Sequence, residues 1–243
     1  MNPIPNALIF HSFENNINSD PFYDLRLIEF KKILEFLKSQ KDGRRIIITF
    51  DDGYKSIIPA VEFSLKNKFK TIIFVVTDYL DKEGFLTKKD LNYLSSKGCQ
   101  VGSHTKSHAN LNKLKMNLLE DELLESKQIL EKIINKKVTS LSFPYGQKNK
   151  LSIKKAFQYY DLIYISRPLI FKNDSIIGRI SINKSNINKY ENIFYLAGDN
   201  LKIFFFLRLL IISIIKRLIP NKYYLFIKTK ITGKNSTDVF NSN

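Results

Sequence analysis

The chain reads Ile46-Ile47-Ile48-Thr49-Phe50-Asp51-Asp52-Gly53 at the point that decides its fold. Five β-branched or aromatic residues in a row predict a strand. Consecutive side chains that leave a strand point in different directions, so one carboxylate can bind a metal while its neighbour faces a substrate. Gly53 permits the abrupt turn that follows. A plain Asp-Gly turn with one helix-capping carboxylate is an equally good interpretation of the tripeptide alone.

Similar runs recur on both sides of this stretch and predict seven strands in all. They are Ala7–Phe10, Arg45–Phe50, Thr71–Val76, Gln100–Val101, Val138–Phe143, Leu162–Ile165 and Arg179–Ile182. Between most of them, apolar residues recur at helical spacing of three, four or seven. Two such patterns are Leu27, Phe30, Leu34 and Leu37, and Leu119, Leu123, Leu130 and Ile134. Alternating strands and helices predict a parallel α/β fold, either an open doubly wound sheet or a barrel.

Helix boundary signals agree with this alternation. Thr87 followed by Asp90 predicts a capping box, and Asn117 followed by Glu120 resembles one. Gly43 and Gly98 lie where helices are expected to end. In both candidate folds, chemistry belongs at the carboxyl ends of the strands.

A histidine pair follows the fourth predicted strand, in Gly102-Ser103-His104-Thr105-Lys106-Ser107-His108. The spacing of four brings two imidazoles to one point on a helical turn or tight loop, as metal ligation requires. An isolated pair is more often surface decoration. Joined by an aspartate from another strand end, however, two histidines make a facial metal site with positions open for water.

A third cluster, Ser142-Phe143-Pro144-Tyr145-Gly146, follows the fifth predicted strand. Alone it is a common Pro-containing turn. In this order and at these strand ends, the three clusters resemble the motifs of the polysaccharide deacetylases, also called the NodB-homology or carbohydrate esterase 4 family. The similarity covers roughly residues 7 to 182. It implies a distorted (β/α)7 barrel, which agrees with the seven predicted strands.

The resemblance also implies roles for individual residues. Asp52, His104 and His108 would hold one divalent metal, with zinc expected and iron, cobalt or nickel as alternatives. Asp51 would be the general base that takes a proton from the attacking water. The backbone N–H of Tyr145 would stabilise the oxyanion.

Two positions depart from the commonest family pattern. No histidine follows His108, so the proton donor expected late in the chain is missing, and His11 in Leu8-Ile9-Phe10-His11 is the one histidine left. An early aromatic-His pair resembles the branch of poly-N-acetylglucosamine deacetylases, in which it supplies the general acid. Ser142 occupies the place of an arginine that often braces the catalytic aspartate. Arg179, which resembles a late arginine of that branch, is a candidate partner of Asp51 instead, although a surface arginine is an equally good interpretation.

The composition is strongly basic and fits a globular chain. The 243 residues carry 39 Lys and Arg against 23 Asp and Glu, a net charge of +16, and 44% of them are hydrophobic. The single cysteine, Cys99, forbids an intramolecular disulfide. Residues 1–16 contain no Lys or Arg, and their apolar run is short, so we expect no export signal.

The charge is concentrated in the C-terminal 43 residues, which carry +7, against +9 for the other 200. We expect the catalytic domain at 1–200, a basic amphipathic helical extension at 201–230 and disorder at 231–243. The extension, Leu201 to Lys230, has an apolar face with Phe204-Phe205-Phe206 and a cationic face, a pattern typical of helices at anionic membrane surfaces. Packing on the barrel as an ordinary last helix is the alternative.

These observations predict a sugar N-deacetylase that acts on an N-acetylated glycan or a lipid-linked saccharide in envelope polysaccharide synthesis. We expect it in the cytoplasm, peripheral on the inner face of the plasma membrane. A deformylase and an O-acetyl esterase are alternatives with the same residues, and an inactive glycan-binding protein is an alternative of another class. We expect no nucleic-acid partner, because no nucleic-acid motif appears and the most basic segment is apolar.

Overall fold

The structure is a computed structural model that describes residues 7–40, 42–167, 169 and 173–189. Seven strands form a closed, entirely parallel barrel whose spatial order follows the chain, with the last strand pairing with the first. The strands are β1 (Ala7–Phe10), β4 (Ile47–Phe50), β5 (Thr71–Val75), β6 (Gln100–Ser103), β7 (Ser140–Ser142), β8 (Leu162–Ile165) and β9 (Ile176–Ser181). Each of the seven predicted runs contributes one strand, so the α/β class and the strand count are confirmed.

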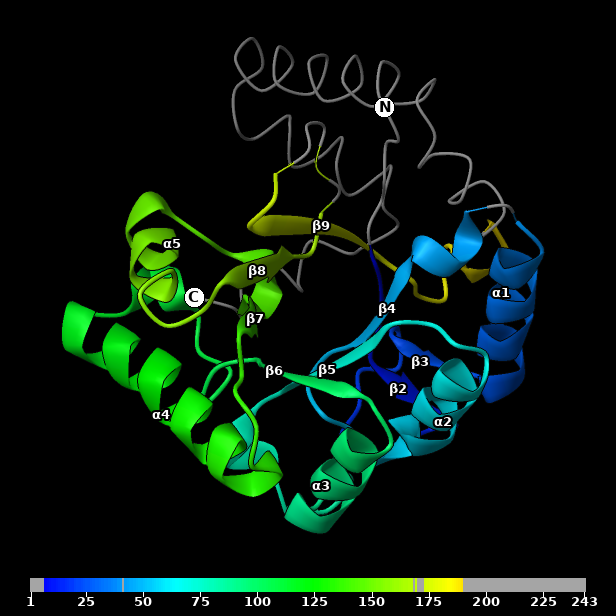
Figure 1. The fold of residues 1–243 in the computed structure, drawn as a ribbon, viewed down its shortest axis with the longest axis horizontal. Helices are drawn as coiled ribbons and strands as arrows, with labels where there is room; N and C mark the ends of the chain where they lie inside the picture. Colours follow the sequence, from blue (N-terminus) through cyan, green and yellow to red (C-terminus); the bar gives the residue numbers. More distant parts are fainter. Residues whose placement is uncertain (1–6, 41, 168, 170–172, 190–243) are drawn as a thin grey trace, which may run out of the picture. The chain divides into compact units, whose positions relative to one another are not determined.

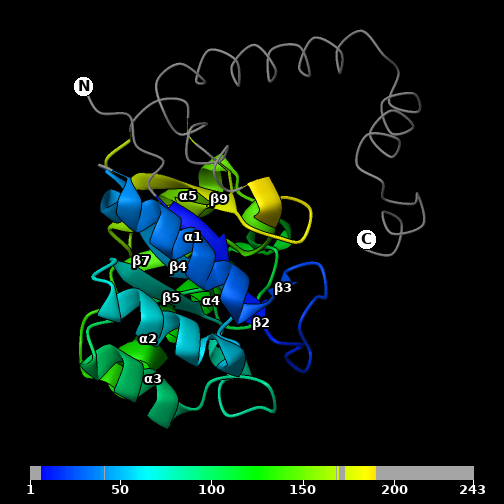
Figure 2. The same ribbon diagram turned by 90° about the vertical axis from the view of Figure 1, so that its right-hand side faces the viewer.

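Helices surround the ring of strands (Figure 1). They are α1 (Leu27–Ser39), α2 (Ile58–Lys66), α3 (Lys88–Ser96), α4 (Met116–Ile134) and α5 (Lys150–Ala156). Figure 2 shows α1, α2 and α3 side by side, and successive helices contact one another. The described residues between β8 and β9 form no helix, so the (β/α)7 pattern is incomplete in the described part of the chain.

Shorter elements complete the described residues. A two-stranded parallel sheet, which the sequence did not predict, pairs β2 (Ser12–Phe13) with β3 (Asp24–Leu25). The 3₁₀ turns are η1 (Gly43–Arg45), η2 (Lys55–Ile57), η3 (Thr77–Tyr79), η4 (Leu111–Lys113), η5 (Pro144–Gly146) and η6 (Ile187–Lys189). No helix in the described ranges is long and apolar enough to cross a bilayer. The predicted extension at 201–230 and the disorder predicted at 231–243 lie outside the described residues.

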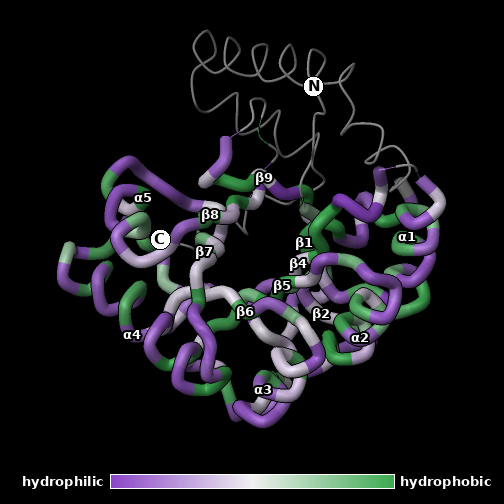
Figure 3. The backbone as a smooth tube through the Cα atoms, viewed as in Figure 1, coloured by the Kyte–Doolittle hydropathy of each residue, from purple (hydrophilic) through white to green (hydrophobic). Residues whose placement is uncertain are grey.

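Side-chain alternation divides the apolar residues into two cores. One lies between the strands and the helices, where Phe30 of α1 packs edge-on against Phe10 and lies 5.7 Å from the ring of Phe50. The helices alternate hydrophilic and hydrophobic residues along their length (Figure 3), as this one-sided packing requires. The other core fills the barrel interior, where Phe74 and Tyr164 are packed 4.9 Å apart.

The interior leaves no room for a side chain at Gly102. A Cβ there would lie 2.5 Å from the ring of Phe74 and 2.9 Å from the hydroxyl of Ser140. The glycine that precedes the histidine pair is therefore needed for close packing below the site.

The predicted helix boundaries are partly correct. Thr87 caps α3 and forms a reciprocal capping box with Asp90, and Gly98 follows the end of that helix with φ +98°. The box predicted at Asn117 is wrong, because α4 already begins at Met116 and Asn117 lies inside its first turn. Gly43 does not end α1 but opens η1, packed so tightly that a Cβ would meet the carbonyl of Leu37.

Candidate active site

The predicted site residues gather at one end of the barrel, just beyond the carboxyl ends of the strands. Asp51 and Asp52 follow β4, His104 follows β6, and Tyr145 lies in η5 after β7. The chain reverses at the aspartates, where Asp52 has φ +72° and the next residue is a glycine in the same left-handed region. This turn sends the two neighbouring carboxylates to different surroundings.

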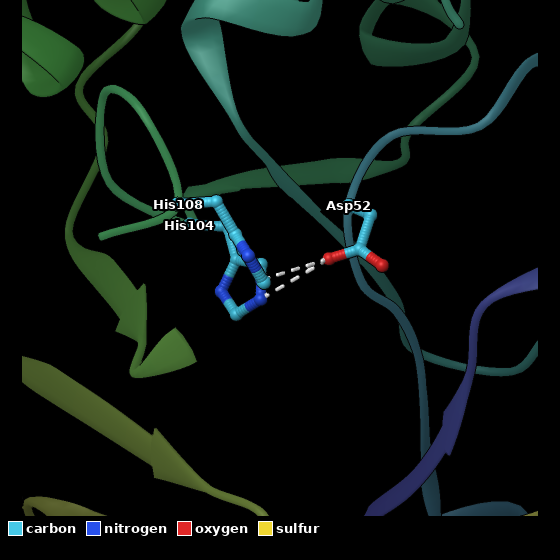
Figure 4. A group of neighbouring side chains, drawn as sticks. All are labelled: Asp52, His104 and His108. Atoms are coloured by element: carbon cyan, nitrogen blue, oxygen red, sulfur yellow. Dashed lines mark ion pairs between the residues drawn. The ribbon is translucent and has the colours of Figure 1, made fainter. Parts of the chain in front are cut away.

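Asp52 faces the two histidines (Figure 4). Its Oδ1 lies 3.4 Å from Nε2 of His104 and 3.3 Å from Nε2 of His108. One ligand atom from each of the three residues can be chosen so that all lie within 4.8 Å of one another. The three predicted metal-ligating residues are therefore brought together.

The hydrogen bonds of the two imidazoles fit metal ligation. His104 Nδ1 lies 2.8 Å from the carbonyl oxygen of Ser142. Because a carbonyl only accepts, Nδ1 donates and carries the hydrogen, which leaves the Nε2 lone pair of neutral His104 facing Asp52. His108 Nδ1 lies 3.2 Å from the hydroxyl of Tyr145, which can either donate or accept. Such partners fix the orientation of metal-ligating histidines, so this donor set fits a divalent cation.

Asp51 points into the barrel, where it is 2% exposed, and meets Arg179 of β9, which is fully buried. The guanidinium donates to both carboxylate oxygens, Nη1 to Oδ1 at 2.7 Å and Nη2 to Oδ2 at 2.8 Å. The expected contact between Arg179 and Asp51 is thus present in bidentate form. Ser142 Oγ donates to Asp51 at 3.2 Å and accepts from Arg179, and Thr49 Oγ1 accepts from Arg179 at 3.0 Å.

The electrostatics of the two carboxylates follow from these contacts. Burial alone would raise the pKa of Asp51, but the charge of Arg179 outweighs it and holds that pKa below the ordinary value. Burial likewise opposes ionisation of Asp52, yet the close contacts of its carboxylate with His104 and His108 bring its pKa well below the usual range. Burial lowers the pKa of His104, whereas the nearby carboxylates of Asp51 and Asp52 raise it above the ordinary value. Both aspartates are therefore ionised at neutral pH.

His11 lies directly after β1, at the same end of the barrel. Its ring packs against Tyr23 at 4.4 Å between centroids, and its buried Nδ1 has no hydrogen-bond partner among the described residues. Burial lowers its pKa, although the charges of Asp52 and Asp51 act in the opposite direction. His11 therefore shares the electrostatic environment of the two aspartates.

Tyr145 lies at the rim, 67% exposed, with its ring 4.7 Å from that of His108. Its backbone has φ +58°, a left-handed conformation between Pro144 and Gly146. Left-handed backbone at a residue other than glycine costs about 1–2 kcal/mol and is concentrated at functional sites. Tyr145 thus combines an unfavourable backbone conformation with a direct side-chain contact to His108, one of the three candidate ligands.

Several residues of the site were not predicted. Thr49, in β4, lies two positions before Asp51, so both side chains point to the same face of the strand, and its hydroxyl contacts Arg179. This two-residue spacing was the one sequence feature that could have predicted its place in the site. The hydroxyls of Tyr23, Tyr54 and Tyr79 lie close enough to Asp52 for its charge to contribute to their raised pKa values, after burial as the main cause. The three tyrosines lie on separate loops, and no sequence pattern linked them.

Comparison with known families places half of the chain in one family. The model of the family described as polysaccharide deacetylase matches residues 38–160, half of the chain. The chain belongs to the polysaccharide deacetylase family. The match includes Asp51, Asp52, His104 and His108, whereas His11 and Arg179 lie outside it.

Curated members of the polysaccharide deacetylase family match part of this chain. A Bacillus subtilis protein named after the family, YxkH, is 29% identical over 112 residues, which are 46% of this chain and 40% of YxkH. The peptidoglycan-N-acetylglucosamine deacetylase PgdA of Listeria monocytogenes is 31% identical over 112 residues, 45% of this chain and 23% of PgdA. The chain thus matches less than half the length of either relative.

A solved structure resembles the fold beyond the matched region. The Streptococcus pyogenes deacetylase PplD superposes with a TM-score of 0.69 at 18% identity, covering 82% of this chain and 100% of PplD. At this identity the likeness concerns the fold alone. The similarity in fold therefore covers more of the chain than the match to the family model.

Proposed function

We propose that this protein is a metal-dependent hydrolase that removes an N-acetyl group from an amino sugar of a glycan or lipid-linked saccharide, leaving a free amine and acetate. One observation carries the proposal. An Asp-His-His cluster lies beside a second, buried carboxylate that is held ionised, with Asp51 Oδ2 3.9 Å from Nε2 of His104. This pairing of a cation site with a separate base is what amide hydrolysis requires.

We assign the cation to Asp52, His104 and His108. A divalent cation bound there would polarise a carbonyl and make water a nucleophile at neutral pH. Two imidazoles and one carboxylate suit zinc, which we expect, and also iron, cobalt or nickel. The hydrogen bonds to both Nδ1 atoms support the assignment because they present the Nε2 atoms to a common point.

Asp51 would act as the general base that takes a proton from the attacking water. Arg179 and Ser142 hold its carboxylate in place and ionised. The backbone N–H of Tyr145 would donate to the oxyanion as the amide carbonyl becomes tetrahedral. The left-handed turn at Tyr145 supports this role because it sets the direction of that N–H.

His11 would protonate the departing amine. Its place after β1, near Asp51 and Asp52, supports this role and with it membership of the branch with an early aromatic-His motif, typified by poly-N-acetylglucosamine deacetylases. The name of the similar protein PgdA refers to N-acetylglucosamine in peptidoglycan. We therefore choose N-acetylglucosamine oligosaccharides as the first substrates.

The place of action is a further part of the proposal. We propose action on the cytoplasmic face of the plasma membrane, through the anionic-membrane affinity of residues 201–230, during envelope polysaccharide synthesis. The support is the sequence pattern of that segment and its share of the positive charge. Truncation after Gly198 should abolish co-sedimentation with anionic liposomes while the barrel stays folded. Unchanged co-sedimentation would show that the segment is not the anchor.

Acetate release from N-acetylglucosamine oligosaccharides tests the activity. We expect Asp51→Asn and His11→Asn each to lower kcat by about 10²–10⁴-fold, the usual contribution of a positioned base or acid. Asp161→Asn, at an exposed aspartate before β8, is the matched control and should keep wild-type activity. Formyl and O-acetyl substrates run in parallel, since faster turnover of either would identify the alternative acyl chemistry. Undiminished acetate release by both site variants would contradict the proposed mechanism.

A further inference from the structure

Residues 104–108, which carry the two histidines and are called the ligand loop below, are held in an unfavourable backbone conformation. Thr105 has φ +69° and His108 has φ +66°, both in the left-handed region and neither a glycine. This region is unfavourable for residues other than glycine, because it brings the Cβ atom too close to the following carbonyl oxygen. The loop therefore needs fixed partners to keep His104 and His108 directed at Asp52.

Those partners come from α4, outside the barrel. The carboxylate of Glu122 accepts the backbone N–H groups of Lys106 and Ser107, both at 2.9 Å on Oε2, and the Ser107 hydroxyl on Oε1. Lys106 and Ser107 are two of the three residues that separate the histidines. Three donors from the ligand loop thus converge on one side chain.

Glu122 occupies an unusual position for a carboxylate. It is 9% exposed and lies on the face of α4 that carries Leu119 and Leu123. Burying a carboxylate on an apolar helix face costs free energy unless its oxygens are hydrogen-bonded. Hydrogen bonds to a carboxylate are about twice as strong as those between neutral groups. The loop donors therefore offset the cost of burying Glu122, and the carboxylate in turn holds the loop in its conformation.

A second contact ties the start of the loop to the same helix. The hydroxyl of Ser126, one turn after Glu122, is hydrogen-bonded to that of Ser103, which in turn accepts the backbone N–H of Thr105 at 3.0 Å. The loop is therefore fastened to α4 on both sides of Thr105. Within the loop, the backbone N–H of His108 donates to Thr105 Oγ1 at 3.2 Å.

We infer that Glu122 is a positioning residue for the metal site: its buried carboxylate fixes the loop that aims His104 and His108 at Asp52. The inference rests on the proposed assignment of a cation to these ligands. It makes cation affinity dependent on a side chain that touches neither the cation nor the substrate. Residues that orient metal ligands typically contribute about 10–100-fold in affinity.

Zinc affinity of the full chain, prepared metal-free and measured by competition with a chelator, tests this role. We expect Glu122→Ala to weaken zinc binding by about 10–100-fold. Glu122→Gln, which keeps an acceptor oxygen but no charge, should weaken it less. Glu125→Ala is the matched control, because Glu125 lies on the same helix and pairs with the same loop at Lys106 Nζ, 2.6 Å away but partly exposed. It should bind zinc like the wild type.

The outcomes separate this inference from the proposed function. If Glu122→Ala and Glu122→Gln are folded by circular dichroism and bind zinc within about twofold of the wild type, Glu122 does not position the ligands. If Glu122→Ala does not fold, the zinc affinities of Glu122→Gln and Ser107→Ala are compared with the wild type instead. Wild-type zinc affinity in both variants overturns the inference. A wild type that binds zinc but releases no acetate contradicts the proposed activity alone. A wild type that binds no zinc overturns the inference as well.

Discussion

At the scale of single residues, two adjacent aspartates acquire different chemistry from different neighbours. Asp51 is paired with a buried arginine inside the barrel, whereas Asp52 faces two imidazoles at its mouth. The sequence predicted this division, because consecutive side chains leave a strand in different directions. The sequence could not predict that the hydroxyls of Thr49 and Ser142 contact this ion pair. Those contacts depend on how β4, β7 and β9 are arranged around the barrel axis.

Arg179 should matter for stability as well as for the site. Arg179→Met leaves the Asp51 carboxylate buried without its partner, and breaking a buried pair in this way costs about 3–5 kcal/mol. We expect this loss in the free energy of unfolding from urea denaturation. Arg44→Met, at an exposed arginine in η1, should change it by less than about 0.5 kcal/mol. Equal effects of the two substitutions would show that the buried pair contributes nothing.

The stability contributed by Asp51 should depend on pH. Because Arg179 holds its pKa below the ordinary value in the folded state, the contribution is complete above the unfolded pKa of about 4 and is lost as pH falls through the folded pKa. The difference in unfolding free energy between wild type and Asp51→Asn should therefore be constant above about pH 5 and shrink below pH 4. Denaturation at several pH values measures it. A difference that stays constant down to pH 3 would mean that the pKa of Asp51 is not lowered.

At the scale of elements, strands were easier to predict than loops. Short β-branched runs such as Leu162–Ile165 have no other good interpretation, and β8 occupies those same residues. The ligand loop was harder, because its shape is set by Glu122 from a distant helix. A charge three residues after Leu119, on the apolar face of a predicted helix, was the one available signal, and it names no partner.

Helix capping offers a direct comparison of a correct and an incorrect prediction. Thr87→Ala removes the side chain that accepts the N–H of Asp90 and should cost about 1 kcal/mol of unfolding free energy. Asn117→Ala should change it by less than about 0.5 kcal/mol, because Asn117 is exposed inside the first turn of α4. Thermal denaturation distinguishes them. A larger loss for Asn117→Ala than for Thr87→Ala would place the start of α4 at Asn117 after all.

At the scale of the whole molecule, the fold brings distant segments to one end of the barrel. His11 directly follows the first barrel strand, and Arg179 lies in the last; these two strands pair with each other and close the ring. The number of strands and their parallel arrangement could be predicted from the sequence, because strands and helices alternate along it. Their spatial order could not, since a doubly wound sheet and a barrel order the strands differently. Closure could not be derived from periodicity, which left an open sheet as an alternative, and the family resemblance favoured the barrel.

We propose that one divalent cation, held by Asp52, His104 and His108, is required for deacetylation. The most direct test of this claim is zinc titration of chelator-treated protein, with acetate release from N-acetylglucosamine oligosaccharides and bound zinc measured in the same samples. We predict no acetate without metal, a rise that ends at a single bound equivalent, and neither zinc binding nor activity in Asp52→Ala. Full acetate release from the metal-free protein, or from Asp52→Ala, would contradict the claim.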